Sequence, residues 1–364
     1  MGVEPLEARY YHFKEDLFKQ FVSDSSKNQN IDKTITKINL QNGTYEINNG
    51  IGKLKNFESK DFIKYQLSFS FNQNAKCKKF EEYLNFVLPE RELQDILSEF
   101  MASIFINNSI LKLEKILLLS GGGSNGKGVF FEIIQALLGE ENISSHSLES
   151  LTKKETTRAQ IQHKLLNFGG EASQNLDPTA LKTLASKEPI EAKFLYKDTF
   201  IMRDYASLAF NINGLPKDVE HTHGFFRRFI VIPFRVFIPD EKQDKKLPQK
   251  IIKNELSGIF NWILKGLDRL MLNEGFTESE IVKNEIYNFK KDNDSVLQFL
   301  DDSNYQQSLK NYELQKDIHR EYQNYCELNG YRACATNTFG NRLVANKYHL
   351  TKKSQGKVIY IEKK

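Results

Sequence analysis

A glycine-rich loop between an apolar run and a helical segment constrains this chain more than any other feature. The loop is Gly-Gly-Gly-Ser-Asn-Gly-Lys-Gly at 121–128; an apolar run ends at Leu119, and residues 127–138 have helical spacing. It fits the frame G-x-x-x-x-G-K, in which backbone N–H groups and a helix N-terminus face phosphate oxygens and the lysine reaches the β- and γ-phosphates. We therefore expect a phosphate-binding loop in a layered α/β domain. A purely structural glycine turn is the alternative.

The loop departs from its frame at one position. The residue after the lysine is normally Ser or Thr, whose hydroxyl holds Mg²⁺, and here it is Gly128. The alternative to an active site is thus a loop that binds nucleotide and hydrolyses it poorly. The predicted contacts to ATP phosphates are Gly121, Gly122, Gly123, Ser124, Asn125, Gly126, Lys127, Gly128 and Val129.

Composition narrows the class of protein. The chain has 364 residues, of which 40% are hydrophobic and 27% charged, which predicts two or three globular domains and excludes a collagen-like or disordered chain. Its 3 cysteines have no metal-ligand spacing, which favours a reducing compartment. No apolar run approaches the roughly 20 residues that span a bilayer, and residues 1–30 do not resemble a signal peptide. We expect a soluble protein of the host-cell cytoplasm without membrane partners.

Three regions differ in pattern. Residues 1–112 are predicted to form a mostly helical accessory or oligomerisation region, with a β-hairpin turning at Asn42-Gly43. Residues 113–300 alternate strand-like runs with helices, which predicts an ATPase domain with a mainly parallel sheet and a last helix over 256–276.

The third region, residues 301–364, is expected to form a separate unit. Helices over 314–328 and 337–346 precede strands over 348–352 and 357–362, the pattern of a winged-helix DNA-binding domain. Residues 341–364 contain seven Lys or Arg against one Glu, so phosphate binding competes here with an ordinary solvated surface.

Three further motifs are candidates to complete a nucleotide site. Glu171 follows the apolar run 164–168 and two glycines, where it would hold Mg²⁺ and orient the attacking water. Asn213 ends a third apolar run and would contact the γ-phosphate. Arg227 and Arg228 directly precede a fourth run, a suitable place for an arginine finger that reaches a neighbouring subunit. The alternatives are a surface glutamate, a simple turn and a salt-bridged surface pair.

In this order and spacing, the motifs resemble the superfamily 3 helicases of the AAA+ class, and in particular the C-terminal helicase part of phage, plasmid and poxvirus primase–helicases. The residues that carry the likeness are 125–128, Glu171, 209–216 and 225–234, at the Walker A, Walker B, sensor-1 and arginine-finger positions. Residues 41–57 and 80–105 look like the accessory region of that family. The Walker B strand has one acid instead of two.

The resemblance implies a hexamer that uses ATP and Mg²⁺ to translocate 3′ to 5′ on single-stranded or forked DNA during replication of a mobile element. A primase or polymerase domain would lie outside this chain. Arg228, or else Arg227, takes the finger position. The family's pore hairpin maps to 181–200, with strands expected over 190–196 and 199–202. Its candidate DNA contacts are Lys193, Tyr196 and Lys197, Lys197 first; an exposed charged turn is the alternative.

Two other functions stay open. A nucleotide-gated initiator or loader would bind ATP and DNA with little hydrolysis, which Gly128 favours. An RNA translocase would share every motif, and only the winged-helix pattern tilts the interpretation towards DNA.

Overall fold

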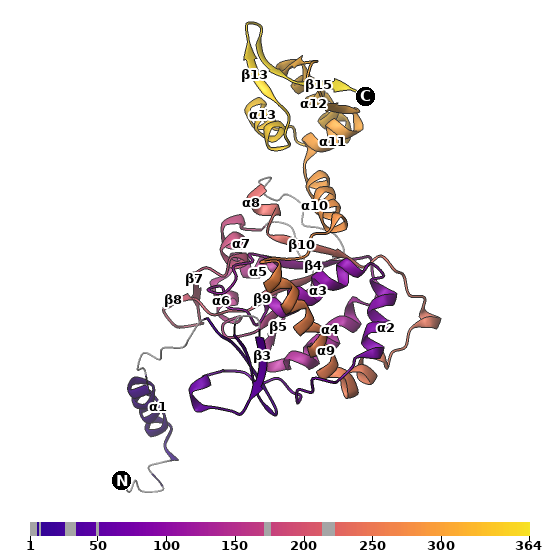
Figure 1. Cartoon of the computed structure of the whole chain (residues 1–364). Coiled ribbons are helices and arrows are strands. Elements are labelled where there is room, and N and C mark those ends of the chain that lie inside the picture. The colour runs from indigo at the N-terminus through magenta and orange to yellow at the C-terminus, as the bar shows by residue number, and fades with distance from the viewer. Residues whose placement is uncertain (1–5, 7–8, 26–33, 49–50, 171–175, 213–222) are drawn as a thin grey trace.

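The protein is described by a computed structural model (Figure 1). The described residues are 6, 9–25, 34–48, 51–170, 176–212 and 223–364. They form an α/β body, a small C-terminal unit at the end of α10 (Glu280–Asn293), and helix α1 (Tyr11–Ser25), which stands apart from the body in Figure 1. Among them, no helix combines the length and the apolar character needed to cross a membrane.

A five-stranded sheet forms the centre of the body, and every neighbouring pair in it is parallel. This confirms the predicted parallel sheet. Because its strands run the same way, their carboxyl ends meet at one edge, where parallel sheets bind ligands. The strand order is β10 (Phe229–Pro233), β4 (Ile116–Ser120), β9 (Ser207–Ile212), β6 (Leu166–Gly169) and β5 (Ile143–Ser144).

Helices cover both faces of this sheet, as continuous apolar strands require. In β4, Leu117 and Leu119 belong to one buried core, and Ile116 and Leu118 belong to the other. On the first face lie α2 (Lys78–Val87), α3 (Arg91–Ser103), α4 (Lys127–Leu138) and α9 (Leu247–Leu272). On the second lie α5 (Leu148–Lys153), α6 (Glu155–Ala159), α7 (Pro178–Ala185) and α8 (His223–Phe226).

Helix α9 begins nine residues before the predicted start and ends at Leu272. A proline at its second position, Pro248, suits a helix N-terminus because no backbone donor is lost there. The helix packs closely on α3: a Cβ at Gly266 would lie 2.5 Å from the backbone carbon of Ser98. The predicted helical face of α3 is buried against it.

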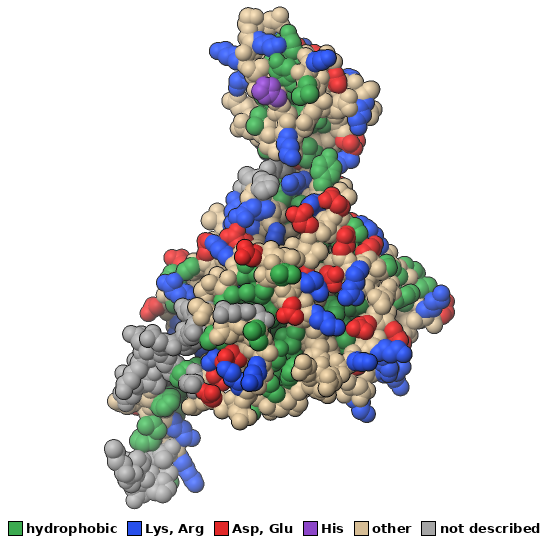
Figure 2. Space-filling view, viewed as in Figure 1, with side chains coloured by type: hydrophobic (Ala, Val, Ile, Leu, Met, Phe, Trp, Pro, Cys, Tyr) green, Lys and Arg blue, Asp and Glu red, His purple; other side chains and the backbone are tan. Residues whose placement is uncertain are grey.

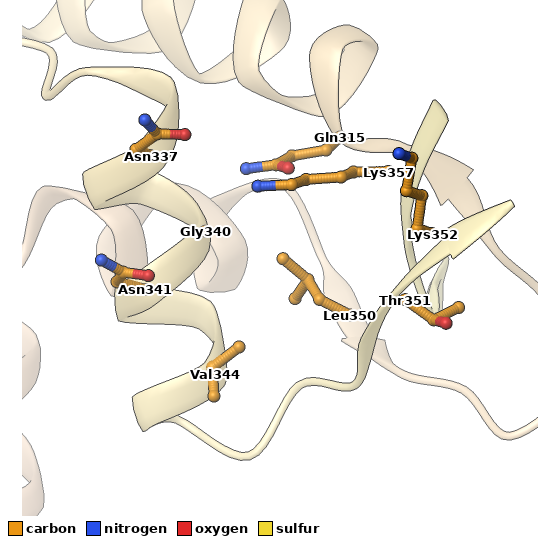
Figure 3. Close-up of a pocket in the computed structure, with 9 residues that line it drawn as sticks. All are labelled: Gln315, Asn337, Gly340, Asn341, Val344, Leu350, Thr351, Lys352 and Lys357. Carbon is orange, nitrogen blue, oxygen red and sulfur yellow. The ribbon is translucent and has the colours of Figure 1, made fainter. Parts of the chain in front are cut away.

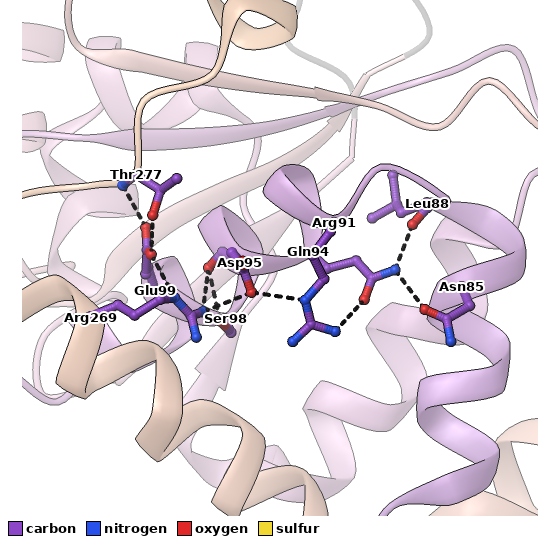
Figure 4. A network of polar contacts seen from close by, with 9 residues as sticks. All are labelled: Asn85, Leu88, Arg91, Gln94, Asp95, Ser98, Glu99, Arg269 and Thr277. Carbon is purple, nitrogen blue, oxygen red and sulfur yellow. Dashed lines mark hydrogen bonds and ion pairs between the residues drawn. The ribbon is translucent and has the colours of Figure 1, made fainter.

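An ion pair between a half-buried arginine and a buried carboxylate joins the same two helices (Figure 4). The carboxylate of Glu99 is fully buried and accepts hydrogen bonds from Arg269 Nε at 3.1 Å and from the backbone N–H of Thr277 at 2.8 Å. The guanidinium of Arg269 also reaches Ser98 Oγ at 2.6 Å. The N-terminal region and the sheet-bearing region therefore share one core.

The N-terminal region also contains an antiparallel sheet of β1 (Thr36–Leu40), β2 (Gly43–Asn48) and β3 (Ile51–Lys55). The hairpin is present, but its two turn residues are Gln41 and Asn42, because Gly43 already pairs with Leu40. The Asn42 side chain instead ties the turn to the backbone of Phe71, accepting at 2.8 Å and donating at 2.9 Å. The strand β3 was not predicted.

The C-terminal unit has a core of its own. The predicted order of two helices and a two-stranded hairpin is present, although the second strand is divided. The elements are α11 (Ser295–Asp302), β11 (Tyr305–Gln307), β12 (Glu313–Leu314), α12 (Gln315–Asn329), α13 (Thr336–Ala345), β13 (Leu350–Lys353), β14 (Gly356–Ile359) and β15 (Ile361–Lys363).

Candidate nucleotide and nucleic-acid site

The glycine-rich loop joins the carboxyl end of β4 to the first turn of α4, as expected. Lys127 begins the helix, is buried, and donates from Nζ to the carbonyl oxygen of Gly121 at 2.6 Å and to Asn125 Oδ1 at 3.2 Å. Burial lowers the pKa of the Lys127 ammonium group. The loop thus holds its lysine with its own acceptors, and a phosphate group would replace neutral oxygens with a charged partner.

Contacts to neighbouring strands fix the loop at the sheet edge. The side chain of buried Asn125 donates to the carbonyl oxygen of Phe234, just after β10, at 3.3 Å. The N–H of Gly121 donates to Ile212 O at 3.2 Å, and the N–H of Ile238 donates to Ser124 O at 2.7 Å. The sequence predicted Asn125 only as a phosphate contact; it also anchors the loop.

A helix of the N-terminal region supports the loop from behind. Tyr83 on α2 donates from Oη to the carbonyl oxygen of Gly126 at 2.8 Å. Gly126 has φ +90°, and a Cβ there would lie 2.7 Å from Val87 Cγ1, so both conformation and space require glycine. Sequence reasoning missed Tyr83, whose only local signal is its place on the apolar face of α2.

The rest of the loop is open. Gly122, Gly123, Ser124 and Gly128 are exposed, and Val129 is half-buried. A Cβ at Gly128 would have no atom within 4 Å, so the position that usually supplies a hydroxyl for Mg²⁺ is spacious as well as bare. Across the described residues, no group of three or more His, Cys, Asp or Glu is placed to hold a metal. The described part of the loop therefore fits phosphates better than it fits Mg²⁺.

The strand order places the carboxyl ends of two further strands on the same side of the sheet as the loop. Strand β9 lies between β4 and β6, and all three strands end at the same edge. Asn213 follows the last residue of β9, and Glu171 comes two residues after β6. Both residues themselves lie outside the described part of the chain.

The predicted arginines lie at the opposite edge of the sheet. They directly precede β10, and the N–H of Ile116, the first residue of β4, donates to Arg228 O at 2.7 Å. The loop follows Ser120 at the far end of β4. A five-residue strand spans about 16 Å, so neither arginine reaches the phosphate loop of its own chain.

The two arginines have different surroundings. Arg227 is exposed, and its Nη2 pairs with Glu114 Oε2 at 2.7 Å. Arg228 is half-buried; it donates to the carbonyl oxygen of Gly224, and its Nη2 lies 3.5 Å from Ser186 Oγ. Its Nε is buried without a hydrogen-bond partner among the described residues.

The expected hairpin is formed by β7 (Ile190–Lys193) and β8 (Thr199–Met202), a shorter first strand than predicted. Lys193 and Lys197 are exposed, and Tyr196, with φ +59°, is fully exposed at the tip. The tip also carries Leu195, 71% exposed, which was not predicted. The hairpin therefore presents an apolar tip flanked by two lysines.

Comparison with known proteins gives partial matches. Residues 119–228 match a family described as "Family of unknown function (DUF5906)", and residues 5–89 match "D5 N terminal like". The first range contains the loop and both arginines, and the second contains Tyr83. The two family matches thus meet at the Tyr83–Gly126 hydrogen bond.

A protein named "Putative helicase" from Acanthamoeba polyphaga mimivirus is 21% identical over 255 residues, which cover 65% of this chain and 26% of that protein. The chain therefore spans about a quarter of the length of this curated relative.

Two solved structures share the fold. They are the A form apo structure of the NrS-1 C terminal region, at 14% identity, and a second apo structure of that region, at 15%. Each has a TM-score of 0.50; the alignments cover 94% and 95% of this chain and 97% and 98% of the solved chains.

Proposed function

We propose that this chain is an ATP-dependent DNA helicase or translocase of the superfamily 3, AAA+ type, which works as a ring, with 3′-to-5′ polarity, in the replication of a mobile element. The observation that carries the proposal is the division of the candidate site between two sheet edges: the loop with Lys127 at one edge, and Arg227 and Arg228 at the other. The helicase-named viral relative supports it.

The chemistry follows from this division. ATP binds at the loop, where backbone N–H groups and Lys127 neutralise the phosphates. Asn213 contacts the γ-phosphate, and Glu171 accepts a proton from the attacking water. Mg²⁺, held by the phosphates and Glu171, would supply charge neutralisation.

The finger comes from a neighbouring chain. Arg228 is proposed first because it lies directly against β10. Its Nε has no hydrogen-bond partner among the described residues, which is consistent with a side chain that finds further acceptors in a neighbouring chain. Arg227 is the second candidate, and Glu114 would have to release it. Either arginine stabilises the charge that develops on the transferred phosphoryl group.

The β7–β8 hairpin contacts the DNA strand. Lys197 and Lys193 bind phosphates, and the exposed ring of Tyr196 offers a stacking surface that suits any base. Coupling of hairpin movement to hydrolysis would draw one strand through the ring.

The decisive experiment measures steady-state hydrolysis of ATP with Mg²⁺, with and without single-stranded DNA, and the unwinding of a forked duplex. We expect DNA-stimulated hydrolysis that Lys127→Ala and Arg228→Ala abolish. Arg227→Ala in parallel tells the two arginines apart: wild-type turnover in the Arg228 variant, with loss in the Arg227 variant, would reverse their assignment.

A second function, an ATP-gated initiator or loader, is favoured by one observation, the bare and open position at Gly128. Tight binding of ATP and DNA by the wild-type chain without measurable hydrolysis would establish this function instead of the motor.

A further inference from the structure

We propose that α13 and the β13–β14 hairpin form a second DNA site, which binds duplex DNA and reads A·T base pairs through Asn337 and Asn341. This site goes beyond the motor, because it involves neither the nucleotide loop nor the β7–β8 hairpin. A groove of about 560 Å³ separates the helix from the hairpin (Figure 3).

The outer face of α13 carries uncharged polar side chains. Asn337, Thr338 and Asn341 are exposed, at positions where packing does not dictate the residue. In the interior of the helix, Asn341 is a weaker helix former than Ala, Glu or Lys, and a solvated helix face usually carries charge. Among the described residues, the amide groups of Asn337 and Asn341 have no hydrogen-bond partner. The exposed face of α13 thus presents two amide groups in place of charged side chains.

The β13–β14 hairpin places two like charges opposite each other. Lys352 on β13 lies directly opposite Lys357 on β14. Like charges at directly opposed positions destabilise an antiparallel pair. Neither lysine has an ion-pair partner within the described part of the chain, and both line the groove. In Figure 3 the side chain of Lys357 extends from the hairpin towards α13. A bound anion would relieve this repulsion.

The two features together match duplex DNA. Asn forms a bidentate pair with the N6 and N7 atoms of adenine in the major groove, and apolar side chains contact the thymine methyl group. Val344, 55% exposed, continues the same face. A ten-residue helix is about 15 Å long, and the major groove admits a helix. Lysines beside the helix would contact DNA phosphates and so fix the position of the helix along the duplex.

Single-stranded DNA is the less suitable occupant, because it is bound by stacking on free aromatic rings. The exposed face of α13 has no aromatic residue. The nearby rings of Tyr312 and Tyr360 on the hairpin side are covered by the ammonium group of Lys353, at 3.5 Å and 5.4 Å from the ring centres. Figure 2 shows further Lys and Arg side chains on the surface of this unit.

The test is fluorescence anisotropy of the full chain, without nucleotide, on labelled duplexes that either contain A·T steps or are G·C only, over a range of salt. We expect the A·T duplex to bind roughly tenfold or more tightly. Asn337→Ala with Asn341→Ala should remove this preference while binding to G·C duplex persists. Because Ala favours helix, the unfolding midpoint of this variant should not fall.

The lysine pair tests the phosphate contacts. Lys352→Ala with Lys357→Ala should weaken binding to every duplex and lower the salt dependence by about two phosphate contacts. The matched control is Lys245→Ala with Lys253→Ala, two exposed lysines of the α/β body that should leave both quantities unchanged. Equal affinity for both duplexes in the wild-type chain, or a loss of single-stranded binding alone in the variants, would overturn the proposal. ATP hydrolysis is not read out, so failure of the motor leaves this test intact.

Discussion

The hydroxyl group of Tyr83 donates a hydrogen bond to the carbonyl oxygen of Gly126 across 43 residues of sequence. One partner belongs to helix α2 of the N-terminal region, and the other to the loop that would bind phosphate. Val87, one helical turn further along α2, packs beside the same glycine. The N-terminal region therefore supports the glycine-rich loop of the candidate nucleotide site.

Removal of this hydrogen bond should weaken nucleotide binding. Tyr83→Phe keeps the ring and loses a bond worth about 1 kcal/mol, so we expect ATP affinity to fall by up to about tenfold while the fold is kept. Titration with a fluorescent ATP analogue measures it. The control is Tyr65→Phe, which removes a bond to the backbone of Lys37, remote from the loop. Equal affinities in both variants would contradict the supporting role.

Substitution of two nearby glycines should affect stability differently. Gly126→Ala forces a side chain into a positive φ and against Val87, and should cost about 1–3 kcal/mol of stability. Gly128→Ser places its Cβ in open space and should leave stability unchanged within about 0.5 kcal/mol.

The same Gly128→Ser variant also restores the hydroxyl that usually holds Mg²⁺, so its hydrolysis of ATP should rise at limiting Mg²⁺. Urea unfolding and a Mg²⁺ titration of turnover measure the two effects. A serine variant that unfolds as readily as the Gly126 variant would show that the space at residue 128 is not free.

Breaking the ion pair between Glu99 on α3 and Arg269 on α9 should lower the free energy of unfolding substantially. Arg269→Met leaves the carboxylate of Glu99 buried without its cation, which we expect to cost about 3 kcal/mol in urea unfolding. The comparison is Lys250→Met, which breaks an exposed pair with Asp244 of similar length and should cost less than about 1 kcal/mol. Similar losses of unfolding free energy in both variants would show that the Glu99–Arg269 pair is effectively solvated.

Because of Lys187, the free energy of unfolding should increase with pH in mildly alkaline solution. Burial lowers the pKa of Lys187 to about 8, while the charge of Asp204 opposes the shift. Between this value and the ordinary lysine pKa of 10.5, the unfolded chain binds more protons than the folded one, so the free energy of unfolding increases with pH.

Urea unfolding at several pH values between 8 and 10 measures this slope. Lys187→Met should reduce it, and Lys253→Met, at an exposed site, should not. An identical pH dependence in the wild type and the Lys187 variant would mean that the ammonium group is solvated.

Local patterns predicted the elements that local sequence determines. The apolar run, the glycine loop and the helix 127–138 agree with β4, the loop and α4, because strand, turn and helix signals follow each other directly there. The β7–β8 hairpin and the helices α12 and α13 of the C-terminal unit were predicted for the same reason, whereas α11 was not predicted. The turn before Gly43 was misplaced by one residue, because the hydrogen bond of Asn42 to the backbone of Phe71 joins it to a loop that is distant in the sequence.

Relationships across the fold were not accessible from the sequence. Nothing around Tyr83 indicates that its hydroxyl meets Gly126, and nothing around Glu114 indicates that it pairs with Arg227. The early start of α9 was missed because the polar residues Gln249, Lys250, Lys253 and Asn254 interrupt the apolar pattern of its first turns, although Ile251 is buried there. For the two side-chain contacts, the partner lies far away along the chain, and the periodicity of the sequence carries no information about it.

The separation of Lys127 from Arg227 and Arg228 has a consequence for mixed populations of chains. If each site is shared by two neighbours, a chain without Lys127 still lends its arginines, and a chain without Arg228 still lends its loop. Two variants that are inactive alone would then complement each other when mixed. In a cell that also makes the normal protein, each altered copy would damage only one junction, its own or that of its neighbour, and would leave the other junctions intact.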